Sequence, residues 1–221
     1  MAFDFGTING EYVSHLATIS TPDDGPIFMV NYMRYKEVAD YGDPSVPAIS
    51  GKEADDKYAP VDVLARIGAE VAYFGDVVAP DDDGAEVWHR MGIVRYPTRR
   101  SFIEMQNRPD FKEKAVHKGA GMDFSIVMGA LPEGPLTGDA DGSGIVTFIL
   151  QPTATTVSPA AGASVTLRVE DVVIGDERRF AMLVMAWSAV DGRALPDDAL
   201  VVRARTKIDN MSRLIDESLN P

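Results

Sequence analysis

The sequence predicts an α+β protein: a ferredoxin-like β-α-β-β-α-β domain followed by a β-rich extension that ends in a long helix. Short apolar runs that stop at Gly, Pro or Asp turns indicate strands. Ser50 and Glu53 form a capping-box pattern, which indicates that a helix begins between two such runs. The segment from Trp88 to Gly121 passes from an apolar strand through Pro97 into a helical pattern.

The first strand and helix follow from these signals in chain order. Phe28–Tyr35 reads as a strand after a turn rich in Pro, Asp and Gly. The helix that Ser50 opens should stop at Gly68, because glycine readily adopts the left-handed conformation that ends a helix. Pro60 lies inside this helix and should kink or divide it, since proline cannot donate the backbone hydrogen bond.

The rest of the first half supplies two strands, a helical region and a last strand. Glu70–Val78 and Glu86–Tyr96 read as strands on either side of the acidic turn Asp81–Gly84. Thr98–His117 reads as helix, in two pieces separated at Pro109, and a final strand lies near Phe124–Met128. This order is typical of a ferredoxin-like sheet that carries both helices on one face.

A loop rich in Pro, Gly and Asp near residues 131–143 divides the chain, so we expect one domain over residues 1–133 and another over 144–221. Ile145–Leu150 reads as a strand, and Val165–Ile174 and Phe180–Trp187 read as a hairpin. A final helix is predicted because apolar residues recur at spacings of three and four: Leu200, Ala204, Ile208, Met211, Ile215 and Leu219.

Two interpretations of this second part stay open. It is an extra β-rich subdomain packed on the first, which the absence of a visibly repeated motif favours. Alternatively, it is a degenerate second ferredoxin-like unit without its first helix, in which case one chain closes a pseudo-twofold barrel by itself.

Composition excludes several classes of function. The net charge of −13 disfavours nucleic acid and anionic membranes as partners, although the segment from Trp88 to Lys118 carries eight basic and only three acidic residues. The chain has no cysteine, which excludes disulfides, thiolate nucleophiles and cysteine-based metal sites. No basic start followed by an apolar run and no membrane-length apolar stretch is visible, so we expect a cytoplasmic protein.

Several spaced motifs lie between about residues 26 and 131: Val30–Tyr35, Gly51–Glu53 with Tyr58, Ile93–Pro97 with Arg99–Phe102, and Ala115–His117 with Ala120 and Gly121. Together they resemble the dimeric α/β-barrel superfamily, and within it an uncharacterised domain-of-unknown-function branch. The resemblance implies a homodimer in which two ferredoxin-like sheets close one barrel. It also implies a small-molecule pocket between sheet and helices in each subunit. Members include cofactor-independent monooxygenases, isomerases of lactone pathways and haem-binding proteins.

His117 is the candidate catalytic residue. An imidazole near the end of a helix, beside a pocket between sheet and helices, can act as a general base near neutral pH. The alternative is a surface histidine that is favoured at the helix C-terminus by the helix dipole.

Four other residues are candidates for binding the substrate. Asn31 and Arg95 lie on strands that should be neighbours, where an amide and a guanidinium can orient a carbonyl or carboxylate. Alternatively, Asn31 satisfies backbone groups and Arg95 pairs with an acid. Tyr58 and Trp88 can line an apolar pocket with a polar tip, or simply pack in the core.

No metal or cofactor is expected from the sequence. The three histidines are scattered and lack the spacing of a zinc site. Asp139–Gly144 resembles the opening of a calcium loop, but Leu150 stands where such a loop needs a bidentate Glu, so a turn leading into the next strand is preferred.

The leading hypothesis is a cofactor-independent enzyme, of oxygenase or isomerase type, that acts on a small organic substrate. Asn31 and Arg95 would bind a substrate oxygen and His117 would move a proton. The alternative is a non-catalytic ligand-binding or assembly module.

Overall fold

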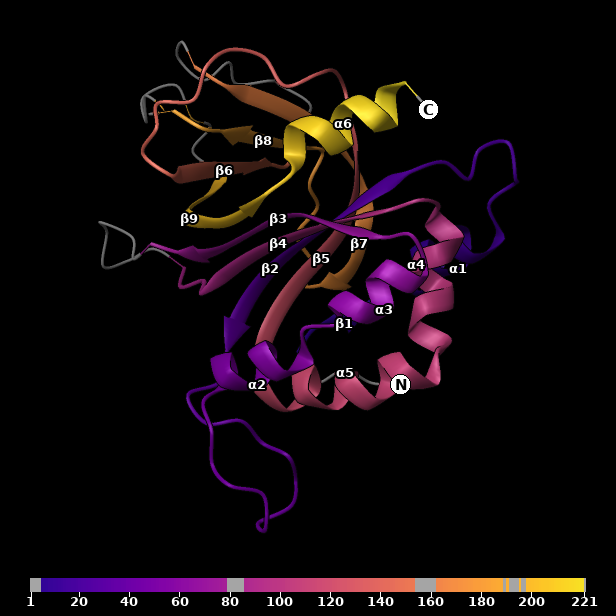
Figure 1. Ribbon diagram of the computed structural model, residues 1–221, viewed down its shortest axis with the longest axis vertical. Coiled ribbons are helices and arrows are strands. Elements are labelled where there is room, and N and C mark those ends of the chain that lie inside the picture. The colour runs from indigo at the N-terminus through magenta and orange to yellow at the C-terminus, as the bar shows by residue number, and fades with distance from the viewer. Residues whose placement is uncertain are drawn as a thin grey trace.

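An eight-stranded antiparallel barrel forms the centre of the protein in the computed structural model, which describes residues 5–78, 86–153, 162–188 and 198–220 together with Val190 and Leu195 (Figure 1). The eight barrel strands follow the order β7-β5-β2-β4-β3-β9-β6-β8, and β8 pairs again with β7 to close the barrel. The short strand β1 pairs with β7 alone and is not part of the closed ring. The α+β class is confirmed. The sheet is a closed barrel rather than a simple ferredoxin-like sheet, because its edge strands find partners in the second half of the chain.

The first half has the expected β-α-β-β-α-β order. Its elements are β2 (Ile27–Tyr35), α2 (Gly51–Tyr58), α3 (Val61–Arg66), β3 (Glu70–Val77), β4 (Arg90–Tyr96), α4 (Arg99–Asn107), α5 (Pro109–Gly121) and β5 (Met122–Pro132). Its strands lie side by side in the order β5-β2-β4-β3. The helices α2 to α5 lie together on one outer side of these strands (Figure 1).

The local helix signals are confirmed. The Ser50 hydroxyl accepts a hydrogen bond from the Glu53 amide at 3.2 Å, and the Glu53 carboxylate accepts one from the Ser50 amide at 2.8 Å. Pro60 separates α2 from α3, as its missing donor requires. Gly68, with φ of +71°, follows α3. The acidic turn Asp81–Gly84 lies outside the described residues.

The second half repeats the strand order of the first. It contains β6 (Ile145–Gln151), β7 (Ser164–Gly175), β8 (Met182–Ala186), β9 (Leu200–Asp209) and α6 (Met211–Leu219). Its order β9-β6-β8-β7 places the last, first, third and second strands side by side, as β5-β2-β4-β3 does. The last strand of each half pairs with the second strand of the other, so the barrel has a pseudo-twofold arrangement within one chain. The expected domain boundary between residues 133 and 144 stays a prediction.

The helix predicted from Leu200 to Leu219 is wrong in its first half. Residues 200–209 form β9, and α6 begins only at Met211. The buried Val202 and Ala204 alternate with exposed neighbours such as Val201, which is the period of a strand. The strand conformation is stabilised because β9 forms backbone hydrogen bonds to β3 on one side and to β6 on the other. The predicted hairpin of β7 and β8 is confirmed by their pairing.

An N-terminal segment packs on the same outer side of the barrel. β1 (Thr7–Ile8) pairs with β7, and α1 (Gly10–Thr18) packs against α4. Arg99 at the start of α4 reaches Glu170 on β7 with Nη2–Oε1 of 2.6 Å and Nε–Oε2 of 2.9 Å. This bidentate pair ties the helix layer to the barrel.

The two faces of the sheet build two separate cores. Along β2, Phe28, Val30 and Tyr32 point into the barrel, where side chains from both halves meet. Met29 on the same strand belongs to the core that lies beneath the helices. The face between sheet and helices is therefore built mainly by the first half and the N-terminal segment, and β7 of the second half adds Val173.

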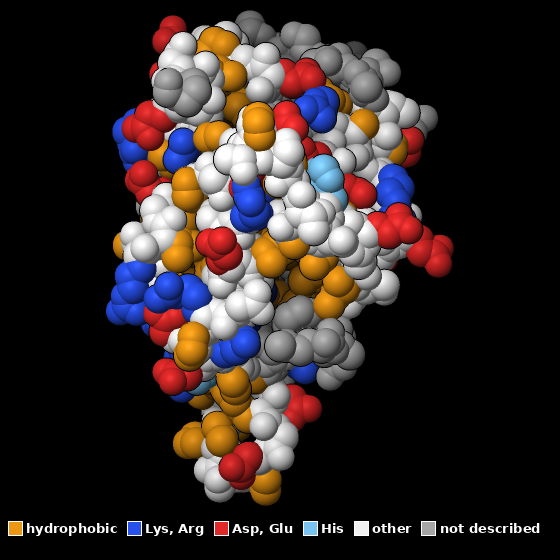
Figure 2. All heavy atoms as spheres, turned by 90° about the vertical axis from the view of Figure 1, so that its right-hand side faces the viewer, with side chains coloured by type: hydrophobic (Ala, Val, Ile, Leu, Met, Phe, Trp, Pro, Cys, Tyr) orange, Lys and Arg blue, Asp and Glu red, His pale blue; other side chains and the backbone are white. Residues whose placement is uncertain are grey.

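The outer surface mixes charges of both signs. Figure 2 shows acidic and basic side chains interspersed over one face, with hydrophobic side chains gathered near its middle. Of the helices described, none is long and apolar enough to cross a membrane.

Candidate functional site

A cavity of about 270 Å³ lies between the outer face of the sheet and the helices α2 to α5. Strands β2 and β4 form its floor, and all four helices contribute to its walls. Its surface is mainly apolar, with side chains that include Met29, Leu64, Val94, Phe102, Met105 and Phe111. Pockets of this kind suit small organic ligands. We call it the α2–α5 cavity.

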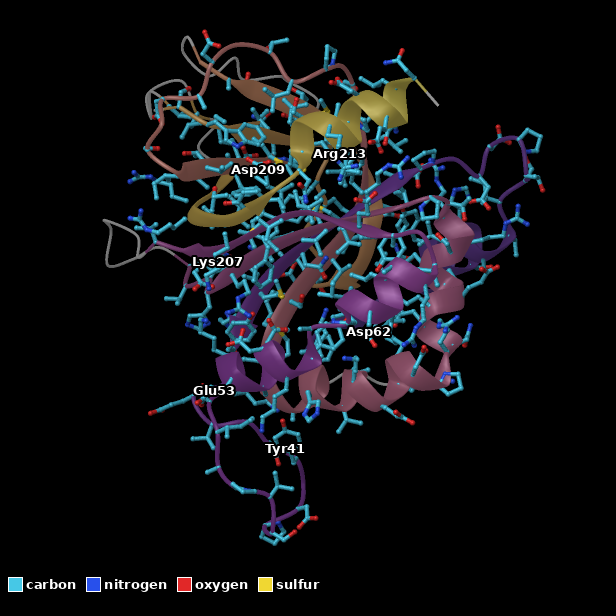
Figure 3. The ribbon with its side chains drawn as sticks, viewed as in Figure 1. Tyr41, Glu53, Asp62, Lys207, Asp209 and Arg213 are labelled. Carbon is cyan, nitrogen blue, oxygen red and sulfur yellow. The ribbon has the colours of Figure 1, made fainter. Side chains whose placement is uncertain are left out.

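Close packing of α2 on α5 fixes one end of this cavity. A methyl group added to Gly51 or to Gly121 would overlap the backbone of the other residue, so only glycine permits this approach. The approach places Asp55 and Tyr58 of α2 opposite Lys118 of α5. On the outside, Asp62 of α3 pairs with Lys114 of α5 at 3.2 Å; Asp62 is labelled in Figure 3.

Arg90 of β4 is the most buried charged residue of the cavity wall, with 1% of its surface exposed. Its Nε donates to Asp76 at 3.0 Å, and its Nη1 lies 2.7 Å from Asp55 and 2.8 Å from Asp56. Its guanidinium also lies 4.7 Å from the centre of the Phe74 ring. Burial opposes the charge, but Tyr35 and Asp55 together hold the pKa of Arg90 above its usual value.

One donor of Arg90 remains free. Nη2 is buried and has no hydrogen-bond partner among the residues that the structure describes. A buried charged donor without an acceptor costs about 1–3 kcal/mol or more, so this nitrogen stands out as a binding group.

The carboxylates around Arg90 are themselves satisfied. Asp55 accepts from the Tyr35 hydroxyl at 2.6 Å as well as from Arg90. Asp76 pairs at 2.6 Å with Lys207 of β9, which is labelled in Figure 3. Burial would raise the pKa of Asp76, but hydrogen bonds from Lys207 and Arg90 hold it below its usual value. The acids thus hold Arg90 in place.

Lys118 is the second cation of the cavity wall, and its amine is unpaired. Its Nζ lies 5.4 Å from the centre of the Tyr58 ring. No described acid forms an ion pair with it. Burial lowers the pKa of Lys118, and the charge of Asp55 offsets only part of this effect.

Two of the residues predicted to form the site lie on the cavity wall. Asn31 projects from β2, and its amide nitrogen donates to the Met29 carbonyl at 3.1 Å. Tyr58 packs edge-to-face on Phe111, with ring centres 5.9 Å apart. Burial raises the pKa of Tyr58 well above its usual value.

His117 lies elsewhere. It precedes Lys118 on α5, so its side chain points about 100° away around the helix. Its Nδ1 lies 2.8 Å from the hydroxyl of Tyr41, which belongs to the loop below α2 and α5 in Figure 3. His117 is not among the residues that line the cavity.

Arg95 and Trp88 also lie away from the cavity. Arg95 donates through Nε to the Ser218 hydroxyl of α6 at 2.8 Å. Trp88 is buried in the barrel core, with its ring centre 5.5 Å from that of Tyr32. The structure therefore brings Asn31 and Tyr58 together and separates His117, Arg95 and Trp88 from them.

Sequence reasoning missed Arg90 and Lys118 as site residues. Arg95 was chosen on β4, but its register places it opposite Phe28, whose side chain points into the barrel. Gly92 lies opposite Asn31 and Arg90 opposite Met33, so Arg90 shares the face of Asn31. Because neighbouring residues of a strand point to opposite faces, the sequence indicated that only one of His89 and Arg90 lies on the face covered by helices. It did not indicate which of the two.

The residues that line the cavity include no histidine, and the chain has no cysteine. In the described part of the chain, no group of three or more His, Asp or Glu residues is placed to hold a metal ion. At Asp139–Gly144, the Ser143 amide donates to Asp141 at 2.8 Å and the chain turns into β6. We derive no step through a haem or a metal.

Comparisons with known proteins give structural context only. A protein of unknown function from Rhodopseudomonas palustris is 26% identical; the match covers 59% of this chain and 98% of that one, with a TM-score of 0.48. A putative monooxygenase from Lactobacillus acidophilus is 12% identical, with 86% and 98% covered and a TM-score of 0.43. A mutant chlorite dismutase from Candidatus Nitrospira defluvii, in complex with cyanide, is 8% identical, with 93% and 98% covered and a TM-score of 0.47.

No protein-family model matches the chain, and no curated protein matches it. The structural neighbours thus include putative monooxygenases and a chlorite dismutase. Because these likenesses are distant, we base no argument on them, and membership of the dimeric α/β-barrel superfamily stays a prediction.

Proposed function

We propose that the α2–α5 cavity binds a small organic acid and that the protein acts on it as a cofactor-independent enzyme of oxygenase or isomerase type. The observation that carries the proposal is that Arg90 lies in the wall of an apolar cavity and that its buried Nη2 has no hydrogen-bond partner among the described residues. The apolar body of the ligand would lie among the methionine and phenylalanine side chains. An oxygen of its carboxylate would accept a hydrogen bond from Nη2.

Physical chemistry favours this occupant over a purely apolar one. Apolar walls gain free energy by releasing water, roughly 25 cal/mol per Å² of apolar surface covered. A ligand oxygen would also satisfy Nη2 with a charge-assisted hydrogen bond, the stronger kind in proteins. Because Asp55, Asp56 and Asp76 hold Arg90 from the other sides, the donor is in place before the ligand arrives.

The same arrangement supports chemistry without a cofactor. A fixed guanidinium stabilises negative charge that develops on a nearby oxygen when a proton leaves the adjacent carbon. Asn31 adds a polar group on the floor, and Tyr58 adds an aromatic wall, as in the roles predicted for them. We do not assign the proton transfer to His117, since its ring contacts Tyr41 outside the cavity.

Binding can be tested with 3-phenylpropanoate, an acid with an aromatic body, by titration calorimetry. The variant Arg90→Lys keeps the charge but removes Nη2, and we expect affinity to fall about tenfold to a hundredfold, the value of one charged hydrogen bond. Arg95→Lys is the matched control on the same strand, because Arg95 contacts Ser218 instead. Equal affinities for Arg90→Lys and the unchanged protein, with both folded, would contradict the proposal.

The alternative is a non-catalytic ligand-binding module. An enzyme of isomerase type should exchange the hydrogens next to the carbonyl of a bound oxo acid with solvent deuterium, which proton NMR measures. Binding without exchange or product would favour the module.

A homodimer and a cytoplasmic location stay predictions. Because both edges of each half-sheet are paired within one chain, closing the barrel needs no second subunit.

A further inference from the structure

Lys118 is a cavity residue that the binding of a carboxylate at Arg90 does not use. It lies on α5, one turn from the end of the helix, and contributes to the wall opposite α2. Lys112 on the same helix is exposed, whereas Lys118 is half-buried. Lys118 has its amine over the Tyr58 ring, at 5.4 Å from the ring centre.

The charged and titratable groups that face Lys118 leave its amine without a strong partner. Asp55, Asp56 and Tyr58 of α2 and Arg90 of β4 line the same cavity, and of these groups the Tyr58 ring lies under the amine. Asp55 already accepts hydrogen bonds from Arg90 at 2.7 Å and from Tyr35 at 2.6 Å. Burial therefore outweighs the attraction of Asp55 and lowers the pKa of Lys118. A lysine desolvated in this way is a nucleophile at a pH where ordinary lysines are protonated.

We propose that Lys118 forms an imine with the ketone or aldehyde carbon of a ligand held in the α2–α5 cavity. This inference rests on the proposed function, because the carbonyl must be brought to the amine by binding. The ligand class is then a small oxo acid with an apolar body: its carboxylate lies at Nη2 of Arg90, and its carbonyl reaches Nζ of Lys118.

The covalent step needs no further reactant. The neutral amine forms a C–N bond to the carbonyl carbon, and the C=O π electrons move to the oxygen, which takes up a proton. Loss of this oxygen as water, with a proton from the nitrogen, gives the protonated imine. The positive nitrogen withdraws electrons from the neighbouring carbon and makes its hydrogen acidic, which an isomerase requires.

The experiment traps the imine in the full-length protein. The probe is phenylpyruvate at pH 7 with sodium cyanoborohydride, which reduces an imine to a stable secondary amine, and peptide mass spectrometry locates the modified lysine. We expect modification of Lys118 to exceed that of Lys112 severalfold, because the cavity brings the carbonyl of the bound acid to Nζ of Lys118 and the lowered pKa of Lys118 leaves more of its amine neutral. Lys118→Met should lose the adduct, and Lys112→Met, the matched variant on the exposed side of α5, should keep it.

Added 3-phenylpropanoate should protect Lys118 by occupying the cavity, which tests the site even if Lys118→Met fails to fold. Modification of Lys118 no greater than that of Lys112 would overturn the imine. The two proposals can fail separately. If 3-phenylpropanoate binds but Lys118 stays unmodified, the binding proposal stands and only the imine proposal is contradicted. If 3-phenylpropanoate does not bind, the proposed ligand class falls.

Discussion

At the residue scale, the difference between His117 and Lys118 decides what the cavity can do. The two are adjacent in sequence, but the helix turns about 100° between them. His117 therefore contacts Tyr41 on the outer loop, while Lys118 lines the cavity. A histidine is the natural choice for a proton carrier at neutral pH. A half-buried lysine such as Lys118 can serve instead, because partial removal from water disfavours its charged form.

The lowered pKa of Lys118 predicts how stability depends on pH. Between its folded pKa and the usual lysine value, the unfolded state binds more protons than the folded state. Below its folded pKa, Lys118 is charged in the folded state, which then bears the full free-energy cost of holding that charge away from water. The free energy of unfolding therefore rises as the pH increases through the folded pKa. Urea unfolding from pH 7 to about pH 10 should show this rise, and Lys118→Met should flatten it.

Lys112→Met is the control for that series, because Lys112 is exposed on the same helix. It should leave the slope unchanged. Parallel curves for the unchanged protein and Lys118→Met would show that Lys118 has an ordinary pKa, and the argument for a reactive amine would lose its electrostatic basis.

At the element scale, the helices above the sheet were predictable and the strand β9 was not. Caps, prolines and glycines are local signals, so Ser50, Glu53, Pro60 and Gly68 define the ends of α2 and α3 correctly. Residues 200–209 satisfy a helical spacing and a strand alternation at once. Pairing with β3 and β6 resolves the ambiguity, and neither strand is near in sequence.

The α2–α5 cavity depends on a small residue on α5. Ala115 lines it, and Ala115→Leu should fill part of it without disturbing the helix, because leucine is also a good helix former. We expect the affinity for 3-phenylpropanoate to fall at least about tenfold, while the free energy of unfolding stays equal or rises by about 0.5–2 kcal/mol. Titration calorimetry and urea unfolding measure the two effects.

Val116→Leu is the matched control for Ala115→Leu. Val116 is the next residue on the helix and is 60% exposed, so the leucine introduced there lies in solvent. It should leave the affinity for 3-phenylpropanoate unchanged. Unchanged binding in Ala115→Leu would show that the ligand lies elsewhere.

At the scale of the whole molecule, the two halves share one core. The interior of the barrel combines Phe28 and Ile93 of the first half with Phe148 and Leu183 of the second. The first half would also have two unpaired edges without its partner, since β3 pairs with β9 and β5 pairs with β7.

Residues 1–133 alone should therefore not form a stable monomer. We expect a dimer, which would pair the free edges, or an aggregate, because an exposed apolar sheet face and open strand edges both favour association. Size-exclusion chromatography with light scattering and urea unfolding would show this. A monomer that unfolds cooperatively would contradict it and would support an independent domain ending near residue 133.

The sequence by itself determined the α+β class, the β-α-β-β-α-β order of the first half, the ends of α2 and α3 and the β7–β8 hairpin, because each depends on residues that are near one another in the chain. It also indicated Asn31 and Tyr58, which lie on the cavity wall. Only the tertiary structure decided that the second half closes the barrel, that β9 is a strand, and that Arg90 and Lys118 rather than Arg95 and His117 face the cavity. The physical reason is that strand register and the choice of buried face are set by pairing between distant segments, and a shift of one residue turns every side chain to the other face.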